Sequence, residues 1–372
     1  MQFSGVHFKQ KYDHLTTQWY GENYEPLDLI FEPVFNLRKI ARRPNNLWRY
    51  REAIPIQNNN AIVSFKEGYT PMCSVKLKNG TTVWIKQEQL FTTGSYKDRG
   101  ATVLMSYIKQ TGITHIVQDS SGNAGASIAA YAAKAGIACE IYLPAKTSPA
   151  KILQMQAYGA HIIKVKGNRQ QTADVAFEAA KKSYYASHSF NPLFFHGTKT
   201  FAYEVCEQLG WKAPDSVVIP VGNGTLLLGC FIGFNELANA GIISHIPRLI
   251  AVQALNCNPV ASAFHGYLRK DQKNKTTIAE GIAITNPVRM QQILDAVSET
   301  GGTFISVSES QIATAWKQMA QQGYFIEPTS AATIAGVTEY TNNLVKMECI
   351  VSLFSGHGLK SADKIEKFLR NP

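Results

Sequence analysis

The sequence lacks an apolar run long enough to cross a membrane. Its longest apolar stretch, around residues 225–234, is far shorter than the roughly 20 residues that a membrane-spanning helix needs. The first residues show neither an apolar core after a basic stub nor a small-residue cleavage site, so we expect no signal peptide. These absences predict a cytoplasmic protein that has no membrane partner.

Patterns of metal ligands and disulfides are also absent. The six cysteines include no C-x-x-C pair and mostly lie beside apolar residues, which predicts reduced thiols in the core. The nine histidines show no H-E-x-x-H or similar spacing. We therefore predict no metal site.

The net charge of +10 lacks the clustering that nucleic-acid binding needs. The basic residues are dispersed or stand in short polar loops, such as residues 164–169 and 269–275. This distribution indicates a solvated surface, and it would attract small anionic substrates. We predict no nucleic-acid partner.

What the sequence does contain is a regular alternation of strand and helix patterns. The 372 residues, 45% of them hydrophobic, suffice for a large core and suggest two lobes. From about residue 100, β-branched runs at 113–117 and 138–143 flank a small-residue helical stretch at 124–135. This order predicts an α/β fold in which parallel or mixed sheets are flanked by helices.

The same patterns predict the later elements and the domains. We expect strands at 161–166, 216–221, 248–254 and 349–354, and helices at 148–158, 171–185, 201–209, 226–240, 287–296, 309–322 and 331–341. The predicted domains are an N-terminal arm (1–60), a small domain (101–189), and a large domain built from 61–100 and 190–372. Prolines separated by aromatic residues favour an arm that packs on the body or on a partner subunit.

Lys97 is the first candidate for chemistry. It stands between a strand-like run at 82–85 and a helix expected at 101–109, so it would begin the first turn of that helix. A lysine at a helix start is mildly disfavoured by the helix dipole. Lys97 is therefore either an exposed surface residue or, in a pocket, an amine that loses its proton and forms an imine with an aldehyde cofactor.

The second candidate is the turn at residues 120–125, which follows an expected strand and opens a helix. Backbone N–H groups at such a turn bind carboxylates or phosphates, and the hydroxyls of Ser120 and Ser121 add donors. Asn123 can donate to the phenolic oxygen of a pyridoxal ring. An ordinary polar loop that caps the helix would explain the same residues.

The third candidate is the glycine turn at residues 220–225, again between a strand and a helix. Gly222 and Gly224 let the backbone approach a phosphate closely, and Thr225 adds a hydroxyl. The spacing matches neither a dinucleotide fingerprint nor a Walker loop. Taken alone, such a turn is weak evidence.

The fourth candidate is Ser355, which an apolar strand delivers to a turn. A neutral hydroxyl opposite a pyridine nitrogen leaves that nitrogen largely unprotonated, which suits elimination and replacement better than transamination. The neighbouring His357 is expected to stabilise the turn.

In this order, the four segments resemble the fold-type II pyridoxal-phosphate (PLP) enzymes, and the flanking segments are similar to the threonine synthase family. Those flanking segments are residues 47–52, 63–71, 156–160, 280–283 and 327–332. The resemblance covers about residues 45–365. It implies a two-lobed enzyme, PLP between the lobes, a homodimer, and a small amino-acid substrate.

The resemblance also implies residue roles. Lys97 would form the Schiff base with PLP and move protons, Asn123 would contact the ring hydroxyl, and Ser355 would face the pyridine nitrogen. The cofactor phosphate would be held by Val221, Gly222, Asn223, Gly224 and Thr225, and the substrate carboxylate by Ser120, Ser121, Gly122, Ala124 and Gly125. The family reaction eliminates phosphate from O-phosphohomoserine and adds water to give threonine.

Two positions depart from the family pattern. Phe194 stands where family members usually have an arginine that grips the substrate phosphate, and a phenyl ring cannot pair with a dianion. Lys199, which we take as the substrate-binding candidate, could compensate, as could His196 or Lys151. Thr225 stands where many relatives have glycine, which a phosphate turn tolerates.

Three functions follow from these patterns. The first is the threonine synthase reaction. The second, favoured by Phe194, is β-elimination or β-replacement on serine, phosphoserine or a related amino acid, in the manner of cysteate synthase or threonine dehydratase. The third is a PLP-bearing sensor without catalysis or a basic nucleic-acid binder, against which the lysine, serine and asparagine set argues.

Overall fold

The computed structural model describes residues 1–147, 149–167, 169–267 and 275–370. The chain divides into two compact units: Met1–Tyr69 with Lys97–Thr198, and Thr70–Tyr96 with Lys199–Pro372. The expected arm at 1–60 clusters with the first unit, as do residues 61–69, 97–100 and 190–198, which the sequence assigned to the large domain. Within the described residues, none of the helices is both long and apolar enough to cross a membrane.

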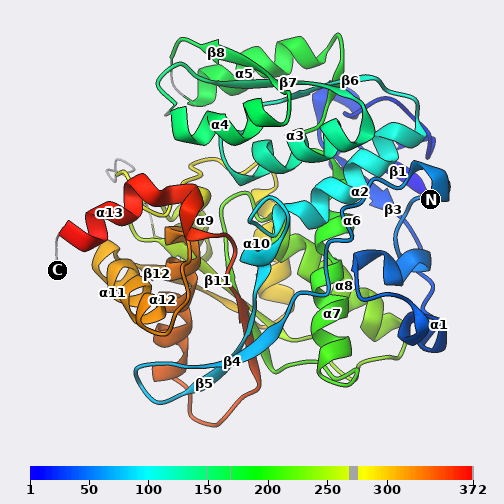
Figure 1. Ribbon diagram of the computed structural model, residues 1–372. Coiled ribbons are helices and arrows are strands. Elements are labelled where there is room, and N and C mark those ends of the chain that lie inside the picture. The colour runs from blue at the N-terminus through cyan, green and yellow to red at the C-terminus, as the bar shows by residue number, and fades with distance from the viewer. Residues whose placement is uncertain (148, 168, 268–274, 371–372) are drawn as a thin grey trace. The chain divides into compact units, whose positions relative to one another are not determined.

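The first unit contains a parallel sheet of four strands in the order β8-β7-β6-β9, with helices around it (Figure 1). Its strands are β6 (His115–Gln118), β7 (Ala138–Pro144), β8 (His161–Val165) and β9 (Tyr184–Tyr185). Its helices are α2 (Lys97–Gln110), α3 (Asn123–Ala135), α4 (Pro149–Ala157), α5 (Arg169–Ala180) and α6 (Pro192–Thr198).

The N-terminal residues of the first unit form an antiparallel sheet of three strands in the order β2-β1-β3. These strands are β1 (Gln2–Gly5), β2 (Lys11–Tyr12) and β3 (Leu27–Ile30), and they are followed by α1 (Leu37–Arg42) and by the 3₁₀ turns η2 (Leu47–Ala53) and η3 (Asn59–Ala61); η1 (Glu22–Tyr24) precedes β3. Trp19 anchors this region, because its ring is buried and its indole N–H donates to the carbonyl of Ala180 at 3.1 Å.

The second unit contains a sheet of six strands in the order β12-β11-β10-β13-β5-β4, parallel except for the pairing of β4 with β5. Its strands are β4 (Met72–Lys76), β5 (Thr82–Lys86), β10 (Ser216–Pro220), β11 (Arg248–Ala254), β12 (Thr303–Val307) and β13 (Ile350–Leu353). Its helices are α7 (Thr200–Gln208), α8 (Thr225–Asn239), α9 (Pro259–Phe264), α10 (Met290–Glu299), α11 (Glu309–Gln321), α12 (Pro328–Asn342) and α13 (Ala362–Arg370), with the 3₁₀ turns η4 (Glu88–Leu90), η5 (Glu280–Ile282) and η6 (Gly358–Ser361).

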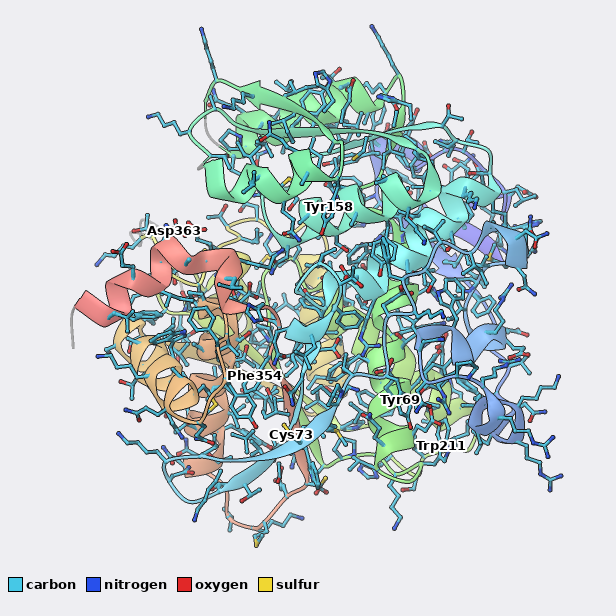
Figure 2. The ribbon with its side chains drawn as sticks, viewed as in Figure 1. Tyr69, Cys73, Tyr158, Trp211, Phe354 and Asp363 are labelled. Carbon is cyan, nitrogen blue, oxygen red and sulfur yellow. The ribbon has the colours of Figure 1, made fainter. Side chains whose placement is uncertain are left out.

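The central strands of the second unit show why the sequence folds in this way. β10 and β13 are short, mainly apolar runs in which each residue is buried, as expected for parallel strands that are covered on both faces. Helix α12 packs against this sheet and lies beside α11 (Figure 1). Phe354, labelled in Figure 2, continues β13 into the core and packs on Tyr324 with ring centroids 4.9 Å apart.

The predicted α/β class is confirmed, and most predicted elements lie within a few residues of their positions in the structure. The helix expected at 171–185 is wrong at its end, because α5 stops at Ala180 and Tyr184 and Tyr185 form strand β9. These two buried tyrosines pair with β6, so a tertiary contact overrides the local helix pattern.

Candidate active site

Two strands of the second unit deliver the predicted turns to one edge of its sheet. β10 and β13 are parallel neighbours, with Ser216 opposite Ile350 and Val217 opposite Val351. The turn at 221–225 follows β10, and the loop at 354–357 follows β13. Because the carboxyl ends of parallel strands share one edge, the glycine turn and Ser355 lie on the same edge of this sheet.

The glycine turn leads directly into the buried start of helix α8. Gly224 has a φ of 70°, in the left-handed region that favours glycine, and as the N-cap residue of α8 it has no side chain with which to cap the helix. Thr225, Leu226 and Leu227 in the first turn of α8 are buried. Backbone N–H groups at the start of a helix can bind an anion.

Gly222 brings a second segment close to this turn. A Cβ atom at Gly222 would lie only 3.0 Å from the carbonyl oxygen of Gly281 and 3.1 Å from the Cα of Ile282. The segment around η5, which contains Gly281, therefore lies directly against the turn. Val221 is fixed behind it, since its N–H donates to the carbonyl of Val252 at 2.8 Å.

Residues 94–96 connect the glycine turn to the Ser355 loop. Ser95 and Gly356 form an isolated antiparallel bridge, and the N–H of Tyr96 donates to the carbonyl of Ser355 at 3.1 Å. The hydroxyl of Tyr96 lies 3.0 Å from Oγ1 of Thr225. One short segment thus contacts both turns, and Lys97 is the next residue in the chain.

Ser355 is buried and has a carboxylate partner. Its hydroxyl donates to Oε1 of Glu327 at 2.8 Å and lies 3.1 Å from Oγ of Ser330. The hydroxyl of Ser330 also accepts from the N–H of Gly356 at 3.2 Å. The hydroxyl of Ser355 is therefore bonded directly to the Glu327 carboxylate, a contact that the sequence did not predict.

Ser95 has a fully buried hydroxyl that lacks a hydrogen-bond partner among the described residues. Leaving a buried hydroxyl unsatisfied costs about 1–3 kcal/mol, so such a group needs an explanation. A polar ligand at the edge where Ser95 meets the Ser355 loop would supply one.

In the first unit, Lys97 begins helix α2 as predicted and is partly buried. Its Nζ lies 5.6 Å from the centroid of the Phe194 ring. The next residue, Asp98, is fully buried and accepts a hydrogen bond from the hydroxyl of Ser127 at 2.6 Å. This bond holds the first turn of α2 against α3.

Phe194 is completely buried and offers no charge. Its ring lies against Gly100 of α2, where any added Cβ would clash with it, and the ring of His188 meets it edge-on at 5.9 Å. Burial, and to a smaller extent the positive charges of Lys97 and Arg169, hold the pKa of His188 well below its usual value. His188 is therefore neutral at pH 7, and neither ring can pair with a phosphate dianion as a cation.

The turn at 120–125 leads into helix α3, which begins at Asn123. The N-cap residue is Gly122, which has no side chain with which to cap the helix. Ser120 is buried, and its hydroxyl accepts from the N–H of Gly122 at 3.3 Å. Gly125 is required by a close approach, because a Cβ atom there would clash with the carbonyl oxygen of Ser120. Ser121 and Asn123 are partly buried beside it, and Ala124 is buried.

We expect Gly125→Ala to weaken substrate binding, because the turn must shift to relieve the clash with Ser120. Overpacking of this kind costs about 1–3 kcal/mol, so KM for the amino-acid substrate should rise on the order of tenfold. Steady-state kinetics and thermal unfolding measure both effects. Gly136→Ala, which strains the left-handed residue at the other end of α3, is the control that loses stability without a change in KM. An unchanged KM in Gly125→Ala would contradict the assignment of this turn.

Lys199 is placed differently from the other candidates. Its Nζ pairs with Oε1 of Glu236 at 2.8 Å inside the second unit, and the hydroxyl of Tyr203 bonds to the same carboxylate. Burial lowers the pKa of Lys199, and the Glu236 carboxylate opposes that shift. This ion pair gives the lysine a partner within the second unit, and its role in substrate binding stays a prediction. His196 is buried in α6, edge-on to Phe31, and the Lys151 side chain lies outside the described structure.

Comparisons with known proteins identify the family of the chain. Residues 63–356 match the family described as pyridoxal-phosphate dependent enzyme. The chain is 38% identical over 336 residues to threonine synthase of Methanocaldococcus jannaschii, covering 87% of this chain and 83% of that protein. It is 32% identical over 329 residues to threonine synthase of Mycobacterium tuberculosis, covering 86% and 89%.

Solved structures share the fold. An L-serine ammonia-lyase from Rhizomucor miehei superposes with a TM-score of 0.71 at 22% identity, covering 82% of this chain and 98% of that one. Threonine deaminase isoform 2 from Solanum lycopersicum superposes with a TM-score of 0.70 at 22% identity, covering 88% and 95%. At this level of identity the likeness concerns the fold alone.

Proposed function

Since the chain belongs to the family of pyridoxal-phosphate-dependent enzymes and is a lyase that uses PLP, we propose that it catalyses the threonine synthase reaction. The substrates would be O-phosphohomoserine and water, and the products threonine and phosphate. The relatives that share 38% and 32% identity over most of the chain support this choice, because both are threonine synthases.

The residues fit PLP. The buried start of α8, which follows a glycine turn, suits the cofactor phosphate, and the unsatisfied hydroxyl of Ser95 suits a polar ligand at the same edge of the sheet. Val221, Gly222, Asn223, Gly224 and Thr225 would hold the phosphate, Asn123 the ring hydroxyl, and Ser355 the side of the pyridine nitrogen. Lys97 would be the point of covalent attachment.

When bound, PLP withdraws electrons from the Cα of an amino acid, which makes elimination and replacement at the neighbouring carbons possible. The residues of this chain would do the rest. Nζ of Lys97 would carry protons between substrate carbons, and the N–H groups and hydroxyls of the turn at 120–125 would orient the substrate carboxylate.

The single observation that carries the proposed site is the segment at 94–96. It contacts the glycine turn through Tyr96 and Thr225 and the serine loop through Ser95 and Gly356. Lys97 follows by one peptide bond, so the backbone that enters the lysine is tied to both cofactor-binding turns.

The test is an assay of PLP-loaded protein with O-phosphohomoserine, in which threonine and inorganic phosphate are both quantified. We expect the two products in equal amounts, and turnover at least about 10³-fold slower in a Lys97→Ala variant. Formation of a ketoacid without phosphate release from any offered phosphorylated substrate would reject the threonine synthase reaction.

Phe194 favours a second candidate, β-elimination or β-replacement on serine, phosphoserine or a related amino acid. The ring is completely buried and uncharged, and its neighbour His188 is neutral, so neither of these two side chains supplies a cation for a distal phosphate. Under this alternative, serine would be converted to a ketoacid and ammonia, or to a substituted product when a nucleophile is added. The same substrate panel separates the two candidates.

A further inference from the structure

We propose that Tyr96 is a positioning residue for the cofactor phosphate. Its hydroxyl donates to Oγ1 of Thr225, and this bond directs the proton of the Thr225 hydroxyl towards the phosphate. The inference rests on the cofactor site proposed above, but it does not depend on which amino acid the enzyme converts.

The geometry places the two hydroxyls at the mouth of helix α8. The phenolic oxygen of Tyr96 lies 3.0 Å from Oγ1 of Thr225, a normal hydrogen-bond distance. Thr225 is buried and is the first residue of α8, directly after the left-handed Gly224. It therefore stands where the N–H groups of α8 would meet an anion.

The backbone of Tyr96 is fixed as well as its side chain. Its N–H donates to the carbonyl of Ser355 at 3.1 Å, and the preceding Ser95 forms a bridge with Gly356. Tyr96 is thus held at its backbone by the serine loop and at its hydroxyl by Thr225. A side chain held in this way loses little further freedom when the cofactor binds.

Either hydroxyl could donate at this distance, and their acidities favour donation by the phenol. Each hydroxyl has one proton and two lone pairs, and a phenol is a stronger acid than an aliphatic alcohol. When Tyr96 donates to Thr225, the threonine proton is directed to a second acceptor, for which a phosphate dianion is the strongest partner at this helix start. Hydrogen bonds that end on a charged acceptor are roughly twice as strong as neutral ones, and a chain of two hydroxyls strengthens each member.

The pair exists only because residue 225 carries a hydroxyl. A glycine at this position would remove the hydroxyl that the phenol of Tyr96 contacts. Tyr96 and Thr225 are separated by 129 residues in the chain, so their roles have to be tested together.

The experiment titrates apoprotein with PLP and, separately, with pyridoxal, which lacks the phosphate. The variants are Tyr96→Phe, Thr225→Val, Thr225→Ser and the double variant Tyr96→Phe with Thr225→Val. Binding is followed by the visible absorbance of the attached cofactor and by quenching of tryptophan fluorescence. Thr341→Val is the matched control, because it removes a threonine hydroxyl that accepts from Asn79 at 2.9 Å elsewhere in the second unit.

We expect Tyr96→Phe to weaken the binding of PLP about fivefold to tenfold and Thr225→Val at least as much, with no change for pyridoxal. The double variant should bind PLP no more weakly than Thr225→Val, because Tyr96 acts through the threonine. Thr225→Ser should retain the wild-type affinity, and the control should change neither titration.

The proposal is overturned if Tyr96→Phe binds PLP as tightly as the wild type, or if its affinities for PLP and pyridoxal fall equally. If Tyr96→Phe does not fold, Thr225→Ser is compared with Thr225→Val. Loss of PLP affinity in both variants would also reject the proposal, because the serine keeps the hydroxyl. The titration uses no amino-acid substrate. A failed O-phosphohomoserine assay would therefore reject the proposed reaction and leave the phosphate contact standing.

Discussion

Lys97→Ala should reduce turnover by at least about 10³-fold and abolish covalent attachment of the cofactor. Positioned proton transfer by a side chain contributes about 10²–10⁴-fold to rate, and here the same amine is also the proposed attachment point. Both functions are lost together when the amine is removed, while the fold should persist, because Lys97 is only partly buried at the start of α2.

The measurement combines kinetics with mass spectrometry after borohydride reduction, which makes the attachment permanent. In the wild type, the added mass should be found on the peptide that contains Lys97. Lys109→Ala is the matched control, because Lys109 lies exposed in the last turn of the same helix and should change neither readout. Cofactor mass on a different lysine would reject the assignment of Lys97 and the site built around it.

Lys86→Met should destabilise the protein by about 3–5 kcal/mol, the expected cost of leaving a buried carboxylate without its partner. Lys86 and Glu204 are both fully buried in the second unit, with Nζ 3.0 Å from Oε2. The same ammonium donates to the carbonyl of Thr70 at 2.7 Å and to Oε1 of Gln208 at 2.9 Å. Urea denaturation followed by circular dichroism measures the loss.

A second substitution tests the cause of this loss. Adding Glu204→Leu to Lys86→Met removes the unpaired charge, so a large part of the lost stability should return. Lys364→Met is the control in the same unit: its pair with Glu280, at 3.0 Å, is partly exposed and is expected to contribute no more than about 1 kcal/mol. A Lys86→Met variant as stable as this control would show that the buried pair does not stabilise the fold.

Local sequence was sufficient for much of the fold. The buried strand β10 and the small-residue helix α3 could be placed because burial on two faces and close packing each leave a pattern within a few neighbouring residues. Strand β9 could not be placed, because Tyr184 and Tyr185 adopt their conformation by pairing with Ile116 and Val117 of β6. Two residues are too short a run to carry a strand period of their own.

In the candidate site, too, some features could be predicted from the sequence and others only from the tertiary structure. The sequence by itself determined the glycine turn, the turn at 120–125 and the position of Lys97 at a helix start, because backbone N–H groups at helix starts and glycine conformations are local properties. Only the tertiary structure decided which partners these groups have. Tyr96 meets Thr225 across 129 residues, Lys199 meets Glu236 across 37, and Ser355 meets Glu327 across 28. A hydrogen bond or ion pair depends on the distance between two atoms in space. That distance is set by the path of the whole chain between them, so the local sequence around either residue does not predict it.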